Sequence, residues 1–117
     1  MESFDLRLGN LVLDIDGKIG KITSISDRSI VVNDESIGFS NLSLKGIPID
    51  NKWLIKFGYQ PIEGIFDEIH FFKKGNHKIW KPFDEFLDDY YRFKIKYVHQ
   101  LQNLYFALNQ EELIYEQ

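Results

Sequence analysis

Cysteine is absent from this 117-residue sequence, so the chain can form neither a disulfide framework nor a thiolate metal site. Long apolar runs are also missing, and the short ones present fall well below the length of a membrane-spanning helix. The first residues, Met1 to Asp5, show neither the basic nor the apolar segment of a secretory signal. From these absences we expect a soluble, cytoplasmic protein without a membrane partner.

An excess of positive charge is absent as well. The chain has 14 Lys and Arg against 18 Asp and Glu, a net charge of −4, which argues against a protein whose whole surface binds nucleic acid. What is present in quantity is hydrophobic and aromatic: 44% and 15% of the residues. Such a chain can bury a real core, so we expect one compact domain over residues 1–117, with subregions 1–46 and 47–117.

The first subregion has the pattern of a small β-structure. Alternating aliphatic residues predict strands at Leu11–Ile15, Lys18–Ile25, Ser29–Val32 and Ser36–Phe39. Asp16-Gly17 is a typical two-residue hairpin turn, and Gly20 marks the expected position of a β-bulge. Short strands at this spacing predict an SH3-like small barrel or a strongly bent antiparallel sheet.

The second subregion mixes helix and strand signals. A short linking helix is predicted over Asn51–Phe57, with Asp50 as N-cap and Gly58 after its end. The two strands Phe66–Lys74 and His77–Lys81 flank Gly75-Asn76, a pair suited to a hairpin turn.

After the hairpin, Asp84–Asp89 is predicted as an acidic connection. Tyr90–Lys96 alternates as a strand, and a C-terminal helix follows from Tyr97 to Leu108. Asn109 is the expected left-handed cap of that helix, and Leu113–Tyr115 is a candidate terminal strand. The predicted fold class is therefore α+β.

The C-terminal helix is a candidate protein-contact surface. No residue from Tyr97 to Gln110 carries a formal charge, and the face opposite the apolar one is polar with an aromatic in its middle. That face supplies the protein-contact candidates His99, Gln102, Asn103 and Phe106. Two interpretations stay open: an external interface with a partner or a second copy, and internal packing between layers of one protein.

The hairpin is a candidate nucleic-acid surface, because lysines and aromatic residues alternate there without an acid from Ile69 to Pro82. A two-residue turn pairs Phe71 with Trp80 and Phe72 with Ile79; we expect the first pair to face inward and the second outward. The nucleic-acid candidates are His70, Phe72, Lys74, His77, Lys81, Arg92, Lys94 and Lys96. The alternative is a structural edge hairpin whose lysines prevent aggregation.

Catalytic, metal and cofactor motifs are not apparent. His70, His77 and His99 lack the spacing of a metal site, and the acidic residues around Asp84 lack the EF-hand glycine. Gly17–Lys21 lacks the spacing of a phosphate-binding loop. We therefore expect a non-enzymatic protein without metal, cofactor or small-molecule substrate.

Two resemblances accompany these patterns. Leu8–Val12 followed by Gly17–Ile22 is similar to the KOW-type segment of SH3-like barrels in ribosomal and transcription proteins. Over nearly the full length, Leu6–Val12, Pro48–Tyr59 and Lys96–Leu108 in this order resemble a group of small uncharacterised proteins of Bacteroidota bacteria, often encoded in prophages or other mobile elements.

The second resemblance implies a phage-like accessory protein and no particular activity. Together with the composition, it leads us to expect a non-enzymatic protein-interaction module. The alternative is a nucleic-acid-binding accessory protein that uses the basic, aromatic hairpin.

Overall fold

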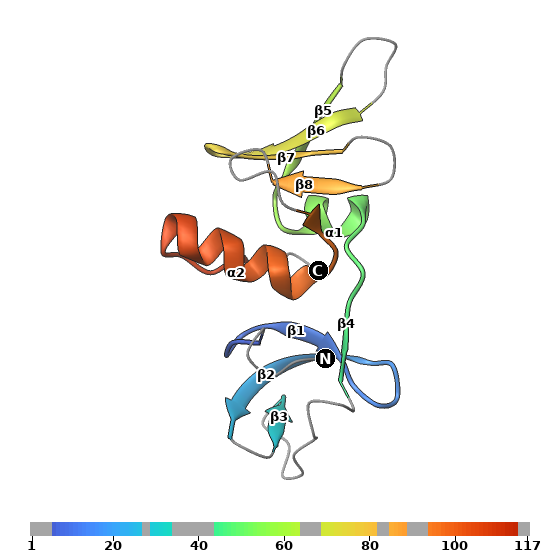
Figure 1. The fold of residues 1–117 in the computed structure, drawn as a ribbon, viewed down its shortest axis with the longest axis vertical. Helices are drawn as coiled ribbons and strands as arrows, with labels where there is room; N and C mark the ends of the chain where they lie inside the picture. Colours follow the sequence, from blue (N-terminus) through green and yellow to red (C-terminus); the bar gives the residue numbers. More distant parts are fainter. Residues whose placement is uncertain are drawn as a thin grey trace. The chain divides into compact units, whose positions relative to one another are not determined.

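A computed structural model shows an α+β protein with two antiparallel sheets and a C-terminal helix (Figure 1). The structure describes residues 6–26, 29–33, 44–63, 69–81, 85–88 and 94–114. By their contacts the residues form two compact units. The first comprises Met1–Pro48 with Tyr97–Leu104, and the second comprises Ile49–Lys96 with Tyr105–Gln117.

The first unit contains a four-stranded sheet of order β3-β2-β1-β4. Its strands are β1 (Leu11–Leu13), β2 (Ile19–Ile25), β3 (Ile30–Val32) and β4 (Lys45–Gly46). All three pairings are antiparallel, and no pairing among the described strands closes this sheet into a barrel. The predicted strand Ser36–Phe39 lies outside the described residues.

The turn between β1 and β2 is longer than predicted. Leu13 pairs with Ile19, so five residues form the connection instead of the two-residue Asp16-Gly17 turn. Asp14 organises this turn, because its Oδ1 accepts hydrogen bonds from the backbone N–H groups of Asp16 and Lys18, both at 2.9 Å. Gly17, with φ of 78°, takes the left-handed conformation that the turn needs.

The position of the bulge also differs from the prediction. Gly20 pairs regularly with Val12, and the register shifts further along β2, between Ile22 and Ser24. A Cβ on Gly20 would lie 3.1 Å from the Cβ of Val32. This glycine therefore permits a close approach between strands and does not form a bulge.

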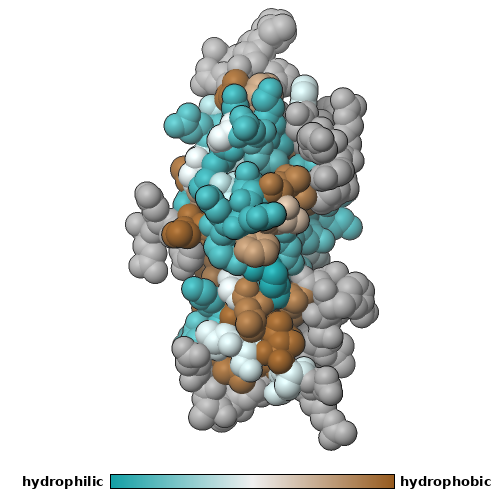
Figure 2. All heavy atoms as spheres, turned by 90° about the vertical axis from the view of Figure 1, so that its left-hand side faces the viewer, coloured by the Kyte–Doolittle hydropathy of each residue, from teal (hydrophilic) through white to brown (hydrophobic). Residues whose placement is uncertain are grey.

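The core of the first unit contains aliphatic side chains from the sheet and from the segments beside it: Leu6, Val12, Ile22, Ile30, Val32 and Leu44. Other apolar residues of the unit are exposed, among them Leu8 (54%) and Ile19 (46%). Figure 2 shows that hydrophobic side chains gather on one face of this unit.

The second unit contains a five-stranded antiparallel sheet in sequential order. Its strands are β5 (Gln60–Glu63), β6 (Ile69–Lys74), β7 (His77–Trp80), β8 (Phe86–Asp88) and β9 (Lys94–Ile95). Two of these elements differ from the prediction. β5 has no counterpart in it, and β8 lies within the stretch Asp84–Asp89 that was predicted to be an acidic connection.

Helix α1 (Asn51–Lys56) begins as predicted and ends one residue earlier than predicted, with Phe57 as its C-cap. The Asp50 carboxylate accepts a hydrogen bond from the backbone N–H of Trp53 at 2.9 Å, which is the N-cap interaction. Gly58 follows the helix with φ of 92°, the left-handed conformation that favours glycine. The predicted docking residues Trp53, Leu54 and Phe57 are all buried.

Helix α2 (Val98–Asn109) confirms the predicted C-terminal helix. The left-handed residue after it is Gln110, with φ of 56°, and not the predicted Asn109. Leu113 and Ile114 belong to no strand, and Tyr115 lies outside the described residues. No helix in the described part of the chain is both long and apolar enough to cross a membrane.

Candidate nucleic-acid interface on the five-stranded sheet

The hairpin β6–β7 has the predicted register. Phe71 pairs with Trp80, Phe72 with Ile79 and Lys74 with His77, which leaves Gly75 and Asn76 as the two-residue turn. Gly75 has φ of 58°, as the first position of such a turn requires.

The predicted assignment of the two hairpin faces is reversed. Phe72 and Ile79 are completely buried, whereas Trp80 is 42% exposed and Phe71 is half-buried. The inner face thus carries Phe72 and Ile79, and the outer face carries Phe71 and Trp80. Alternation along a strand separates two faces but does not say which one the rest of the protein covers.

A buried polar network explains why His77 belongs to the inner face. Its Nδ1 lies 2.5 Å from the hydroxyl of Tyr59, and its Nε2 lies 2.8 Å from Oδ1 of Asp88. Tyr59, His77 and Asp88 are respectively 2%, 6% and 0% exposed. In the neutral Nε2–H tautomer, Tyr59 donates to the imidazole and the imidazole donates to Asp88, so both polar hydrogens have acceptors.

Burial raises the pKa of Tyr59 far above its ordinary value, and the nearby Tyr105 and Asp88 raise it further. The Tyr59 hydroxyl therefore stays protonated as a hydrogen-bond donor. Since none of the three side chains is more than 6% exposed, a substrate from solution does not reach them. We interpret this network as structural: it joins β7 to β8 and to the start of β5.

The structure places some of the nucleic-acid candidates in the interior and others at the surface. Phe72 and His77 are interior, and Lys74 donates a hydrogen bond to the backbone oxygen of Phe57, with its ammonium 5.5 Å from the Tyr105 ring centroid. Lys94 and Lys96 are exposed. The remaining candidates are Lys81, which lines a cavity described below; Arg92, outside the described residues; and His70, whose side chain is outside them.

The outer face of the sheet carries a row of residues that spans all five strands. Register pairs Ile62 with Phe71, Phe71 with Trp80, Trp80 with Leu87, and Leu87 with Lys94. Directly opposed residues of antiparallel strands lie on the same face. With strands about 4.8 Å apart, this row extends over roughly 19 Å.

Lysines surround the aromatic part of this row. Lys73 and Lys78 oppose each other one step along the hairpin, on the same face as Phe71 and Trp80. The rings of Phe71 and Trp80 lie 5.6 Å apart, and the Lys78 ammonium lies 5.4 Å from the Phe71 ring centroid. Lys94, at the end of the row, forms an exposed ion pair with Glu85 at 2.7 Å. We call Ile62, Phe71, Lys73, Lys78, Trp80, Leu87 and Lys94 the aromatic–lysine face.

The protein-contact candidates on α2 also differ in burial. His99 and Gln102 are each 2% exposed, and the His99 ring stacks on Tyr97. Gln102 accepts from the backbone N–H of Leu11 at 2.8 Å and donates to the backbone oxygen of Gly9 at 3.1 Å.

Asn103 has the same kind of role within the first unit. Its Oδ1 accepts from Nδ2 of Asn10 at 2.8 Å and from Nε of Arg7 at 3.2 Å. For His99, Gln102 and Asn103, the absence of charge therefore reflects internal packing, the second of the two interpretations left open by the sequence. Phe106, at 38% exposure, is the candidate that lies at the surface.

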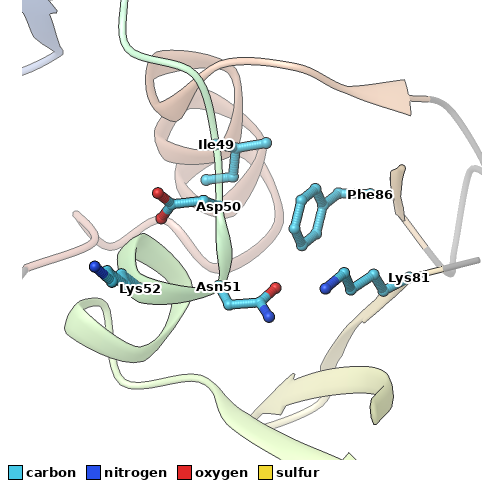
Figure 3. Close-up of a pocket in the computed structure, with 6 residues that line it drawn as sticks. All are labelled: Ile49, Asp50, Asn51, Lys52, Lys81 and Phe86. Atoms are coloured by element: carbon cyan, nitrogen blue, oxygen red, sulfur yellow. The ribbon is translucent and has the colours of Figure 1, made fainter. Parts of the chain in front are cut away.

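A small open cavity lies beside the sheet, within the second unit. It has a volume of about 380 Å³ and is lined by Ile49, Asp50, Asn51, Lys52, Lys81 and Phe86 (Figure 3). The Oδ1 atom of Asn51 is buried and has no hydrogen-bond partner among the described residues. A buried acceptor left in that state costs about 1–3 kcal/mol.

Among the described residues, no three His, Asp or Glu side chains come together as a metal site. No family model, curated protein or solved structure matches the chain in comparisons with known proteins. The resemblance to Bacteroidota mobile-element proteins therefore stays a prediction.

Proposed function

We propose that this protein is a non-enzymatic binding module and that its aromatic–lysine face binds single-stranded nucleic acid. The observation that carries this proposal is the Phe71–Trp80 ring pair, in which Trp80 is exposed and Phe71 half-buried, with Lys73 and Lys78 beside it on the same sheet face. Unpaired bases stack on exposed aromatic rings, and lysines neutralise the phosphates between them.

The lysines distinguish this proposal from a protein-docking face. Aromatic residues are enriched in protein–protein interfaces, but lysine is depleted there. On this face Lys73 is exposed, and Lys78 lies over the Phe71 ring, so a docking protein would have to desolvate ammonium groups around the aromatic centre. A polyanion with flat bases instead complements both kinds of side chain.

The overall charge of −4 limits the form of this binding. The aromatic–lysine face itself supplies only three lysines, so we expect modest affinity that depends strongly on salt. The row contributes rings and aliphatic groups more than hydrogen-bonding groups, and therefore we expect little discrimination between base sequences.

The test is a titration of the full chain with fluorescent single-stranded oligonucleotides of mixed sequence at about 50 mM salt, where phosphate contacts are strong. Trp80→Ala should weaken binding by about tenfold or more, because stacking contributes about 1–3 kcal/mol per base. Phe106→Ala is the matched control, since it removes an aromatic ring of similar exposure, 38% against 42%, from helix α2. Absence of saturable binding by the wild type, or equal binding by wild type and Trp80→Ala, would refute the proposal.

A second candidate function is protein contact through the end of α2. Its support is the exposure of three apolar residues in this region: Phe106 (38%), Leu108 (37%) and Ile114 (75%). Light scattering of wild type and Phe106→Glu tests self-association through this surface. A concentration-dependent dimer that Phe106→Glu dissociates supports it, whereas a monomer in both samples removes the self-association version.

A further inference from the structure

The two rings of the aromatic–lysine face are not equally open to a ligand. Trp80 is 42% exposed, whereas Phe71 is half-buried. The Lys78 ammonium lies over the Phe71 ring, 5.4 Å from its centroid, and the Trp80 ring lies 5.6 Å away on β7. A cation in this position occupies the π-face on which a base would stack. Phe71 therefore supports its neighbour, and Trp80 is the ring that is open to a base.

The residues that flank the ring pair offer no further stacking platform. Ile62 on β5 and Leu87 on β8 lie on either side of the rings in the same row, and both are half-buried. They extend the apolar surface, but an aliphatic side chain has no flat π-system for a second base. Among the described residues of this face, Trp80 is thus the one exposed aromatic ring, and the face can stack one base.

Positive charge lies on one side of the rings, toward the hairpin turn. Lys73 and Lys78 oppose each other there, two residues nearer the turn than the ring pair. Gln60 on β5 opposes Lys73 and is exposed. Directly opposed residues share a sheet face, so these three residues form a second row parallel to the row of the rings. This second row carries two cations and one amide.

The other side of the rings carries an acid. Glu85 precedes Leu87 by two residues on the outer face, and the antiparallel pairing of β7 with β8 places it beyond Trp80, away from the turn. It is exposed and forms an ion pair with Lys94 at 2.7 Å. A carboxylate repels phosphate groups, whereas the lysines on the turn side attract them. The charges therefore favour a strand whose backbone follows the turn side of the rings.

We propose that this face recognises a single unpaired nucleotide with a phosphate on each side, so that the protein binds unpaired stretches as short as three nucleotides. This inference rests on the proposed function and adds the size and the orientation of the ligand. The base stacks on Trp80, and Lys73 and Lys78 neutralise the two phosphates. The exposed amide of Gln60 continues the phosphate row as a hydrogen-bond donor.

The first experiment is an NMR titration of the ¹⁵N-labelled full chain with oligothymidylates of two, three, five and ten nucleotides. The indole N–H of Trp80 and the backbone amides of Lys73 and Lys78 report on the face. The indole N–H of Trp53, which is buried in α1, is the internal control. Affinities are divided by the number of positions at which each oligonucleotide can bind.

We expect three nucleotides to bind within about threefold of ten on this scale, because one base and two phosphates already make all the contacts. The dinucleotide has one phosphate and should bind at least about fivefold more weakly than the trinucleotide. The slope of log affinity against log salt should have a magnitude of about 1.4 for the trinucleotide, the value for two phosphate contacts to a single strand.

Two pairs of variants test the role of each ring and the path of the backbone. Trp80→Leu should weaken trinucleotide binding by about tenfold or more, whereas Phe71→Leu, which keeps an apolar support, should weaken it less than about threefold. Gln60→Lys and Glu85→Gln each raise the net charge by one, on opposite sides of the rings. With the ten-nucleotide strand, Gln60→Lys should increase the salt slope by about 0.7, and Glu85→Gln should leave it unchanged.

The inference and the proposed function fail in different ways. If no oligonucleotide binds saturably, or if Trp80→Leu binds as the wild type does, the proposed function itself is refuted. Suppose instead that ten nucleotides bind through Trp80. The single-nucleotide site is then overturned if three bind more than threefold more weakly per position, or if Phe71→Leu, with an unchanged Trp53 signal, weakens binding as much as Trp80→Leu. A slope change for Glu85→Gln as large as that for Gln60→Lys overturns the backbone path.

Discussion

The two faces of the five-stranded sheet carry similar residues but differ in burial. Each face has an aromatic residue of β6 opposite an apolar residue of β7: Phe72 with Ile79 inside, and Phe71 with Trp80 outside. The inner face also buries a histidine and an aspartate, whereas the outer face carries lysines. Residue type alone therefore does not distinguish a buried face from an exposed one; the residues that cover it do.

The largest expected difference between the faces is in stability. Phe72→Ala should lower the free energy of unfolding by about 3–5 kcal/mol, because it leaves a cavity in a fully packed site. Phe71→Ala, its neighbour on the half-buried face, should cost much less. Urea denaturation of both variants measures the comparison, and equal losses would mean that the outer face is also packed against the protein.

The buried network of the inner face gives the next largest effect. Asp88→Ala should lower the free energy of unfolding by about 1–3 kcal/mol, because the buried Nε2 of His77 loses its acceptor. Tyr59→Phe, which deletes a single hydroxyl at the other end of the network, is the comparison variant. In a double-mutant cycle we expect the two losses to be non-additive, since both groups bond to the same imidazole. Additive losses would contradict a connected network.

The third largest expected effect is a loss of stability at alkaline pH. The pKa of Tyr59 is about 10 in the unfolded chain and higher in the folded protein. At a pH between these two pKa values, the unfolded chain has released the Tyr59 proton and the folded protein retains it. Stability from this group is complete below about pH 10 and falls by about 1.4 kcal/mol per pH unit above it. The measurement is the difference between wild type and Tyr59→Phe in unfolding free energy from pH 9 to 11. A difference that stays constant across this range would contradict the prediction.

The smallest effect concerns the lysines of the outer face. If Lys73 contacts a phosphate, Lys73→Gln should reduce the slope of log affinity against log salt by about 0.7, the value for one contact to a single strand. Lys94→Gln should reduce it less, because Lys94 is already paired with Glu85. Salt titrations of oligonucleotide binding measure both slopes. A larger change of slope for Lys94→Gln than for Lys73→Gln would mean that the phosphates contact Lys94 and not Lys73.

Several elements could be predicted from sequence because their causes are local. Asp50 caps α1 through a neighbouring N–H, Gly58 takes a conformation that other residues resist, and Gly75-Asn76 fixes the register of the hairpin. The strand β8 was missed for the opposite reason. The acidic residues in and around this strand indicate a solvent-exposed connection. The buried partner of Asp88 is His77, which lies on another strand.

The candidate sites show the same limit. The uncharged face of the C-terminal helix indicated that its residues contact other residues, but it did not indicate which ones. The partner of Gln102 is the backbone at the start of β1, 91 residues earlier in the chain. An aromatic hairpin with lysines led to the prediction of a binding surface. Because the two faces are reversed in the structure, the exposed face carries other residues than those predicted. The cavity had no signal in the sequence, because its lining combines residues 49–52 with Lys81 and Phe86, which lie far away in the chain.

What the sequence by itself determined is therefore the set of local choices: the α+β class, the capped helix, the hairpin register and the helix at the C-terminal end. These depend on backbone conformation and on interactions within a few residues. Only the tertiary structure decided which face of each element is covered and which polar groups are paired. Burial and pairing depend on residues far away in the chain, and here they place Phe72 and His77 inside and leave Phe71 and Trp80 at the surface.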